Sequence, residues 1–247
     1  GRYQPEEFND IYDEIQEAQT ALENREYDNA RKRADDVLER MNAFYTALHE
    51  RIQWAHTLQA DAENNQRLAR AANAHRWSPF EYNKAQSLLN QGNSELNGYN
   101  LDKAIDAFEK AKYLFAEAAR SAPEREEEYK SYMARIEELK EQLNQINANR
   151  YEPEKTQRLL ERQENIESLF EQGEYIKARE NATNLVQDFE SFYKELNQRI
   201  QYARTLQKGT EQAMDKAAEE EAYIWADREL ARATMLYTRG IGELRSY

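Results

Sequence analysis

The sequence is short of the residues that most often build reactive sites. Its 247 residues include no cysteine and only 3 histidines. Without cysteine there is no disulfide, no thiolate nucleophile and no cysteine-based zinc site. The sequence also has no Gly-rich phosphate loop, no nucleophile elbow and no metalloprotease helix motif. We therefore expect a protein that is not an enzyme and that binds neither a metal nor a cofactor.

Residues that break helices are also scarce. The chain has 7 glycines and 4 prolines, so it has few turns, and few turns mean long elements. Charged residues make up 33% and hydrophobic residues 40% of the chain, and Ala, Glu, Gln, Lys, Arg and Leu are abundant, which is a helix-forming composition. Aromatic residues, at 11%, argue against disorder. The composition predicts an all-α protein.

An excess of positive charge and long apolar runs are both missing. The formal net charge is −13, and an acidic surface repels phosphate backbones and anionic lipid headgroups. No stretch approaches the roughly 20 apolar residues that a membrane-spanning helix needs. We therefore expect no nucleic-acid partner and no direct insertion into a membrane.

The sequence repeats itself. After a shift of 148 positions, Arg51-Ile52-Gln53 aligns with Arg199-Ile200-Gln201, and Trp77 aligns with Trp225. Half that shift aligns four aromatic residues and three prolines: Tyr3, Trp77, Tyr151 and Trp225, with Pro5, Pro79 and Pro153. The pattern predicts a unit of 74 residues, in copies at 1–76, 77–150 and 151–224 and a partial copy at 225–247.

Each unit is predicted to contain a short helix followed by a very long one. In the first copy, one face of the short helix carries apolar residues three and four positions apart: Phe8, Ile11, Ile15, Ala18 and Leu22. No Gly or Pro lies between Tyr27 and Trp77, which predicts a continuous helix to about Ala74, about 70 Å long. One short helix cannot cover it. We therefore predict an elongated helical repeat array, spectrin-like or solenoid-like, in which each long helix also packs on the next unit's short helix.

Three local features extend this prediction. Small residues at the fourth apolar position of the short helix, Ala18, Gly92 and Gly240, should let another helix approach closely. Pro123 interrupts the second long helix and predicts a break or kink near Ala122, either a fixed corner or a hinge. The chain ends at Tyr247, where a long helix should follow, which we interpret as the end of a fragment of a longer protein.

The aromatic residues that open the units are the most distinctive candidate site. They are Tyr3, Trp77, Tyr151 and Trp225, and Arg76 and Arg150 precede two of them. Either each ring plugs the junction between consecutive units, or the rings form a ladder of recognition sites. We favour the plug because these residues recur at a structural boundary. The arginines could stack on the rings or cap the preceding helix.

Two resemblances bear on function. The segment from Gly98-Tyr99-Asn100 to Ala111 resembles the second helix of tetratricopeptide-type repeats, although the long helix predicted here exceeds that repeat. Ala69 to Ala74, Trp77-Ser78-Pro79, Leu88-Leu89 and Gly98-Tyr99 resemble envelope-associated helical repeat segments of bacterial lipoproteins, notably in spirochaetes. The second resemblance implies a spacer in the periplasm or cell envelope, often next to a peptidoglycan-binding module, with no catalytic residues.

Two functional hypotheses follow. The first is a structural spacer or scaffold that mediates protein–protein interaction within a larger cell-envelope protein. The second is a helical-repeat binding module that holds a peptide or a protein helix on a concave face. Both imply a protein partner, whose identity the sequence leaves open, and the heptad-like apolar stripes are equally compatible with a coiled-coil homodimer. A cytoplasmic location is the alternative to the envelope.

Overall fold

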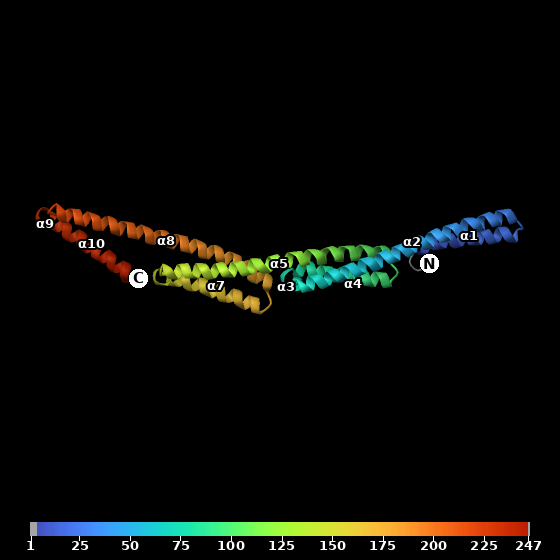
Figure 1. The fold of residues 1–247 in the computed structure, drawn as a ribbon, viewed down its shortest axis with the longest axis horizontal. Coiled ribbons are helices and arrows are strands. Elements are labelled where there is room, and N and C mark those ends of the chain that lie inside the picture. The colour runs from blue at the N-terminus through green and yellow to red at the C-terminus, as the bar shows by residue number, and fades with distance from the viewer. Residues whose placement is uncertain (1–3, 247) are drawn as a thin grey trace. The chain divides into compact units, whose positions relative to one another are not determined.

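The computed structural model describes residues 4–246, and within them the secondary structure is entirely helical (Figure 1). The prediction of an all-α protein is confirmed. In chain order the helices are α1 (Pro5–Glu23), α2 (Tyr27–Ala71), α3 (Ala74–Trp77), α4 (Pro79–Asn97), α5 (Leu101–Gln145), α6 (Ala148–Tyr151), α7 (Pro153–Glu171), α8 (Tyr175–Glu219), α9 (Ala222–Trp225) and α10 (Asp227–Ser246).

Helix lengths follow a fixed succession. A helix of 19 residues is followed by one of 45 residues and one of 4 residues, three times over, before α10. The 19-residue helices begin at Pro5, Pro79 and Pro153, because proline has the right φ for a first turn and its missing N–H has no partner there. The predicted continuous helix from Tyr27 is confirmed, although it ends at Ala71 rather than near Ala74.

The turns between helices depend on residues with a left-handed backbone. Between the 19-residue and 45-residue helices, Arg25 and Tyr99 each have a φ of 64°, and Gly173 has a φ of 82°. A second set, in which φ lies between 54° and 57°, precedes the four-residue helices: Asn73, Asn147 and Glu221. Residues in this conformation end helices by turning the chain away from the axis. Within each set, successive members are 74 positions apart.

The break predicted near Ala122 is absent. Helix α5 continues from Leu101 to Gln145 with Pro123 inside it. The prediction of a break was wrong because it weighed only the local cost of proline, and the kink stays a prediction. The exposed Pro123 leaves the Ala119 carbonyl without its helical partner, but residues on both sides are held from outside the helix. Ser121 lies in hydrogen-bonding contact with Ser78, and Arg125 donates to the Trp77 carbonyl.

The chain divides into two compact units, Gly1–Glu126 and Glu127–Tyr247. In the first unit, α1 packs along the first half of α2 around a small core of Ile11, Val37 and Phe44. Helix α4 packs between the second half of α2 and the first part of α5. Tyr82 of α4 is buried, and its ring makes an edge-to-face contact with the ring of Phe115, with 5.4 Å between the ring centroids.

Gly92 marks the closest helix approach in the first unit. A Cβ atom built on Gly92 would lie 2.5 Å from Cε1 of Phe108, a buried residue of α5. The expected close approach is therefore present at this position. At Gly240 in α10, a Cβ would meet nothing within 4 Å among the described residues.

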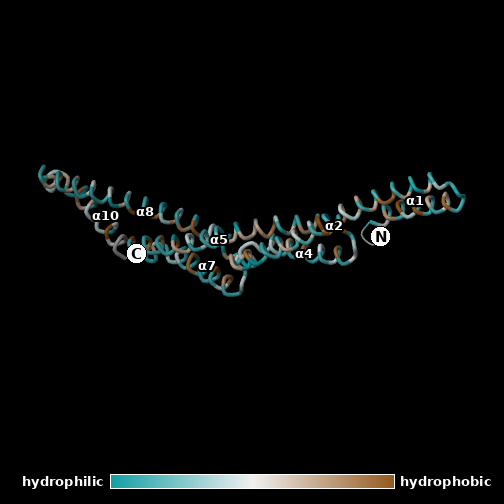
Figure 2. Tube along the Cα trace, turned by 45° about the vertical axis from the view of Figure 1, so that its right-hand side comes forward, coloured by the Kyte–Doolittle hydropathy of each residue, from teal (hydrophilic) through white to brown (hydrophobic). Residues whose placement is uncertain are grey.

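The second unit is built from α7, α8 and the part of α5 after Glu126. Its core is apolar and includes Ile136, Leu139, Ile166, Leu185 and Phe189. The ring of Tyr129 stacks on that of Phe170, with centroids 4.9 Å apart. Helix α10 diverges from α8 with distance from the α9 turn (Figure 1). Along α8, hydrophilic residues predominate, with hydrophobic residues among them (Figure 2). The buried residues of α8 lie in its first half, from Ala178 to Leu196.

Candidate functional site

The aromatic residues that open the units lie in different environments. Trp77 is buried, with 3% of its surface exposed, and Tyr151 is partly buried. Trp225 is 85% exposed and so plugs no junction among the described residues. Tyr3 lies outside the described residues. An aromatic residue at the start of a unit is therefore buried only where other helices pack over it.

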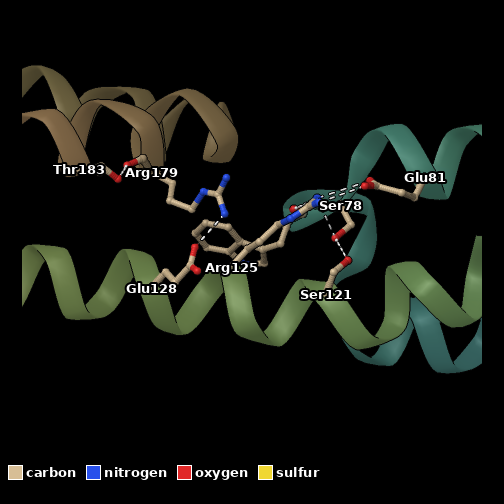
Figure 3. Close-up of polar contacts among 8 residues, drawn as sticks. Ser78, Glu81, Ser121, Arg125, Glu128, Arg179 and Thr183 are labelled. Carbon is tan, nitrogen blue, oxygen red and sulfur yellow. Dashed lines mark hydrogen bonds and ion pairs between the residues drawn. The ribbon is translucent and has the colours of Figure 1, made fainter.

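Arg125 organises the polar contacts around Trp77 (Figure 3). Its Nη1 donates to the Trp77 carbonyl and to Ser78 Oγ, both at 3.1 Å, and its Nη2 donates to Glu81 Oε1 at 2.9 Å. The fully buried Ser78 also lies 2.8 Å, Oγ to Oγ, from Ser121. This cluster fastens the start of α4 to the middle of α5 beside the buried indole.

The Arg125–Glu81 pair is mostly shielded from solvent, with side-chain exposures of 27% and 18%. The hydrogen bond from Arg125 holds the pKa of Glu81 below its ordinary value and outweighs the opposing effect of burial. A general acid or base works best with a pKa near the operating pH. Glu81 is shifted the other way, so this cluster has the character of a structural ion pair.

An arginine recurs at the position of Arg125. Arg51 and Arg199 lie 74 residues before and after it. Arg199 Nη1 donates to Glu152 Oε1 at 2.6 Å, and Glu152 occupies the position equivalent to Ser78. Arg51 forms an ion pair with Asp102. The 74-residue spacing of these arginines is visible in the sequence, but the sequence analysis did not single them out as site residues.

The second unit has its own arginine contact in the same view. Arg179 Nη1 donates to Glu128 Oε2 at 2.9 Å, and the Thr183 hydroxyl donates to the Arg179 carbonyl at 3.0 Å (Figure 3). The pair fastens the start of α8 to α5. The two arginines singled out from the sequence, Arg76 and Arg150, are both exposed, and their proposed stacking or capping role stays a prediction.

Two open apolar grooves lie on the helices. One, of about 480 Å³, runs between α1 and the first half of α2 and is lined by residues that include Leu22, Tyr27, Leu38 and Met41. The other, of about 470 Å³, runs between α8 and α10 and is lined by residues that include Leu206 and Tyr237. Apolar surface of this kind, left open on a helical protein, is a typical site for a further helix.

Neither a cluster of metal-binding side chains nor a membrane-spanning helix is present among residues 4–246. Within this range, no group of three or more His, Asp or Glu side chains is placed to hold a metal ion. Among the described helices, none combines the length and the apolar composition that crossing a bilayer requires.

Comparison of the chain with protein-family models, with curated proteins and with solved structures finds no match.

Proposed function

We propose that this chain is a helical repeat array that acts as a structural spacer or scaffold and mediates protein–protein interaction within a larger cell-envelope protein. The observation that carries the proposal is the threefold succession of helices of 19, 45 and 4 residues, in step with the sequence repeat. Each 45-residue helix is about 68 Å long, at a rise of about 1.5 Å per residue. Elements of this length suit a protein that sets a distance between other modules.

The resemblance to envelope-associated lipoprotein segments supports a location in the periplasm or cell envelope. It rests on the aromatic-x-Pro step at Trp77-Ser78-Pro79 and on the Gly98-Tyr99 turn. The environment of the step adds a structural role to this motif, because Ser78 and the Trp77 carbonyl both accept from Arg125. The step therefore works as a joint between helices, which is what a spacer built from repeated units needs.

Small-angle X-ray scattering, with light scattering to fix the mass, tests the spacer. A compact chain of this length should have a radius of gyration of about 18 Å. If the units form an extended array, we expect the monomer to have a radius of gyration well above roughly 30 Å. A radius near 20 Å at monomer mass would mean that the units fold back on one another, and the spacer proposal would then be wrong.

A helical-repeat binding module is the second candidate. The observation that favours it is the groove between α1 and α2, where Leu22, Tyr27 and Leu38 are 56%, 64% and 60% exposed. In this function the groove would hold a peptide or a protein helix. A folded chain that stays extended in scattering and binds no helix through this groove would leave the spacer as the better description.

A further inference from the structure

The turn between α4 and α5 contains a pair of residues that occurs nowhere else in the chain. Among all the asparagines of the sequence, only Asn97 is followed by a glycine. Asn97 is the last residue of α4, Gly98 caps the helix, and both are exposed. The equivalent pairs in the first and third copies of the repeat are Glu23-Asn24 and Glu171-Gln172. The Asn-Gly pair is therefore a property of the second copy alone.

The side chain of Asn97 is free to rotate. Among residues 4–246 it makes no hydrogen bond, whereas two neighbouring asparagines are held in place. Asn100 donates from Nδ2 to Glu95 Oε2 at 2.8 Å. Asn93 accepts through Oδ1 from Gln59 Nε2, also at 2.8 Å. The amide of Asn97 can therefore turn toward the backbone that follows it.

The backbone nitrogen of Gly98 is the nearest group that this amide can meet. Glycine has no side chain, so nothing on Gly98 itself shields the nitrogen. Its N–H donates to the Ser94 carbonyl at 2.9 Å, in the last turn of α4. Helix ends fray, so this hydrogen bond opens more readily than one inside the helix. Once the bond is open, the nitrogen can approach the side-chain carbon Cγ of Asn97.

We propose that Asn97 is a site of spontaneous deamidation in which the Gly98 nitrogen is the nucleophile. The nitrogen loses its proton to a base in the solvent and bonds to Cγ of Asn97, and the side-chain amide leaves as ammonia. Water then opens the resulting succinimide ring at either carbonyl, which gives aspartate or iso-aspartate. The reaction consumes water, releases ammonia and needs no oxidant or reductant. It is independent of the function proposed above, because only this turn takes part.

Iso-aspartate would disturb the turn more than the added charge does. Glutamate already stands at this position in the first and third copies, so a carboxylate there is compatible with the fold. Iso-aspartate also lengthens the backbone by a methylene group. Hydrogen bonds that close the turn cross this point: the Tyr99 N–H donates to the Leu96 carbonyl at 3.1 Å, and the Asn100 N–H donates to the Glu95 carbonyl at 2.8 Å. We expect the iso-aspartyl form to lose them.

The turn positions buried residues of the first unit. Leu96 and Leu101, on either side of it, are 8% and 3% exposed. Further along α5, the ring of Phe108 covers Gly92 of α4. A loosened turn should weaken these contacts between α4 and α5. Deamidation of Asn97 is therefore a slow and irreversible change that lowers the stability of the first unit.

The first test ages the full chain in a mildly alkaline buffer and maps its asparagines by mass spectrometry of peptides. Asn93 is the internal control, because a small residue, Ser94, follows it but its side chain is held by Gln59. We expect Asn97 to convert about tenfold faster than Asn93, a difference of about 1.4 kcal/mol in the barrier. Conversion of Asn97 no faster than that of Asn93, or only after unfolding in urea, would show the proposal to be wrong.

A variant at position 98 tests the nucleophile. Gly98→Ala shields the backbone nitrogen with a methyl group, and alanine fits because φ at this position is −81° and the new Cβ would lie 3.3 Å from the Ser94 carbonyl oxygen. We expect conversion of Asn97 to slow by about tenfold. Gly209→Ala, the same substitution far from the turn, should leave the rate unchanged. Equal rates in Gly98→Ala and the unmodified chain would exclude the Gly98 nitrogen.

Asn97→Asp separates the effect of the charge from that of iso-aspartate. This variant has the carboxylate but the ordinary backbone, so we expect its melting temperature to stay close to that of the fresh unmodified chain. The melting temperature of the aged chain should fall as its iso-aspartate content rises. An aged chain that melts like Asn97→Asp would overturn the predicted loss of the hydrogen bonds that close the turn.

Discussion

At the scale of the residue, the ring of Phe108 occupies the space where a side chain at position 92 would stand. In Gly92→Ala the added Cβ would lie 2.5 Å from Phe108 Cε1, so the ring or the helix must move. Overpacking a core typically costs about 1–3 kcal/mol. We expect the free energy of unfolding, measured by urea denaturation, to fall by about this amount.

Gly209 provides the matched control for that substitution. Gly209 lies inside α8, as Gly92 lies inside α4, but a Cβ at Gly209 would meet no described atom within 4 Å. Because alanine favours the helix by up to about 1 kcal/mol over glycine, Gly209→Ala should stabilise the chain. Stabilisation by both substitutions would mean that α4 and α5 are not in close contact at Gly92.

The Glu81–Arg125 pair should make the stability of the folded chain depend on pH. The pKa of Glu81 is lowered in the folded chain, so its ionised form is favoured by folding. The resulting stability is fully present above the unfolded pKa, near 4.5, and is lost as the pH falls through the lower folded value. We expect Glu81→Gln to lower the melting temperature at pH 7. The difference from the unmodified chain should shrink below pH 4.5. A difference that is constant with pH would exclude this origin.

At the scale of the element, Pro123 lowers the stability of helix α5. Proline inside a helix is less favourable than alanine by about 3 kcal/mol. Pro123→Ala restores a donor to the Ala119 carbonyl, so we expect stabilisation by about 1–3 kcal/mol in urea denaturation. Glu124→Ala, an exposed neighbour on the same helix, is the control and should change little. A destabilised Pro123→Ala chain would mean that the proline ring itself packs favourably.

The elements are also where the sequence was most informative. Helix composition and the lack of Gly and Pro between Tyr27 and Trp77 were enough to predict a helix of unusual length, because local propensity and packing agree there. The failure at Pro123 has the opposite cause. The residues on either side of the proline contact Ser78 and Trp77, which lie more than 40 positions earlier in the sequence. No local sequence pattern predicts contacts between such distant residues.

The candidate site was predicted less well for the same reason. Trp77 and Trp225 occupy equivalent positions in the sequence, yet one is buried and the other is 85% exposed. Arg125, which contacts the Trp77 carbonyl, stands 48 positions after it in the sequence, on a different helix. Equivalent residues can therefore differ in burial, because burial depends on packing against distant parts of the chain.

At the scale of the whole molecule, the repeat can be tested by removing one copy. Deletion of 77–150 joins Arg76 to Tyr151, which is the order Arg150–Tyr151 already has. We expect a folded helical chain by circular dichroism, with a lowered melting temperature because Asp61 would face Val186 instead of its partner Lys112.

A deletion out of step with the repeat, 60–131, is the control for that experiment. It removes two residues fewer than one repeat and joins Gln59 to Tyr132, so the apolar stripes of the joined helices are turned by about 200° relative to each other, at about 3.6 residues per turn. We expect this chain to lose its cooperative melting. If both deletions fold equally well, the 74-residue spacing is not what positions the helices.

Helix α5 belongs to both compact units, since the boundary after Glu126 falls within its span of Leu101–Gln145. Its buried residues are divided accordingly, with Phe108 and Phe115 in one core and Ile136 and Leu139 in the other. Unwinding α5 in one core frays the helix that the other core needs, so heat should be absorbed in a single calorimetric peak. Pro123 removes one helical hydrogen bond near this boundary, so Pro123→Ala should make that peak sharper.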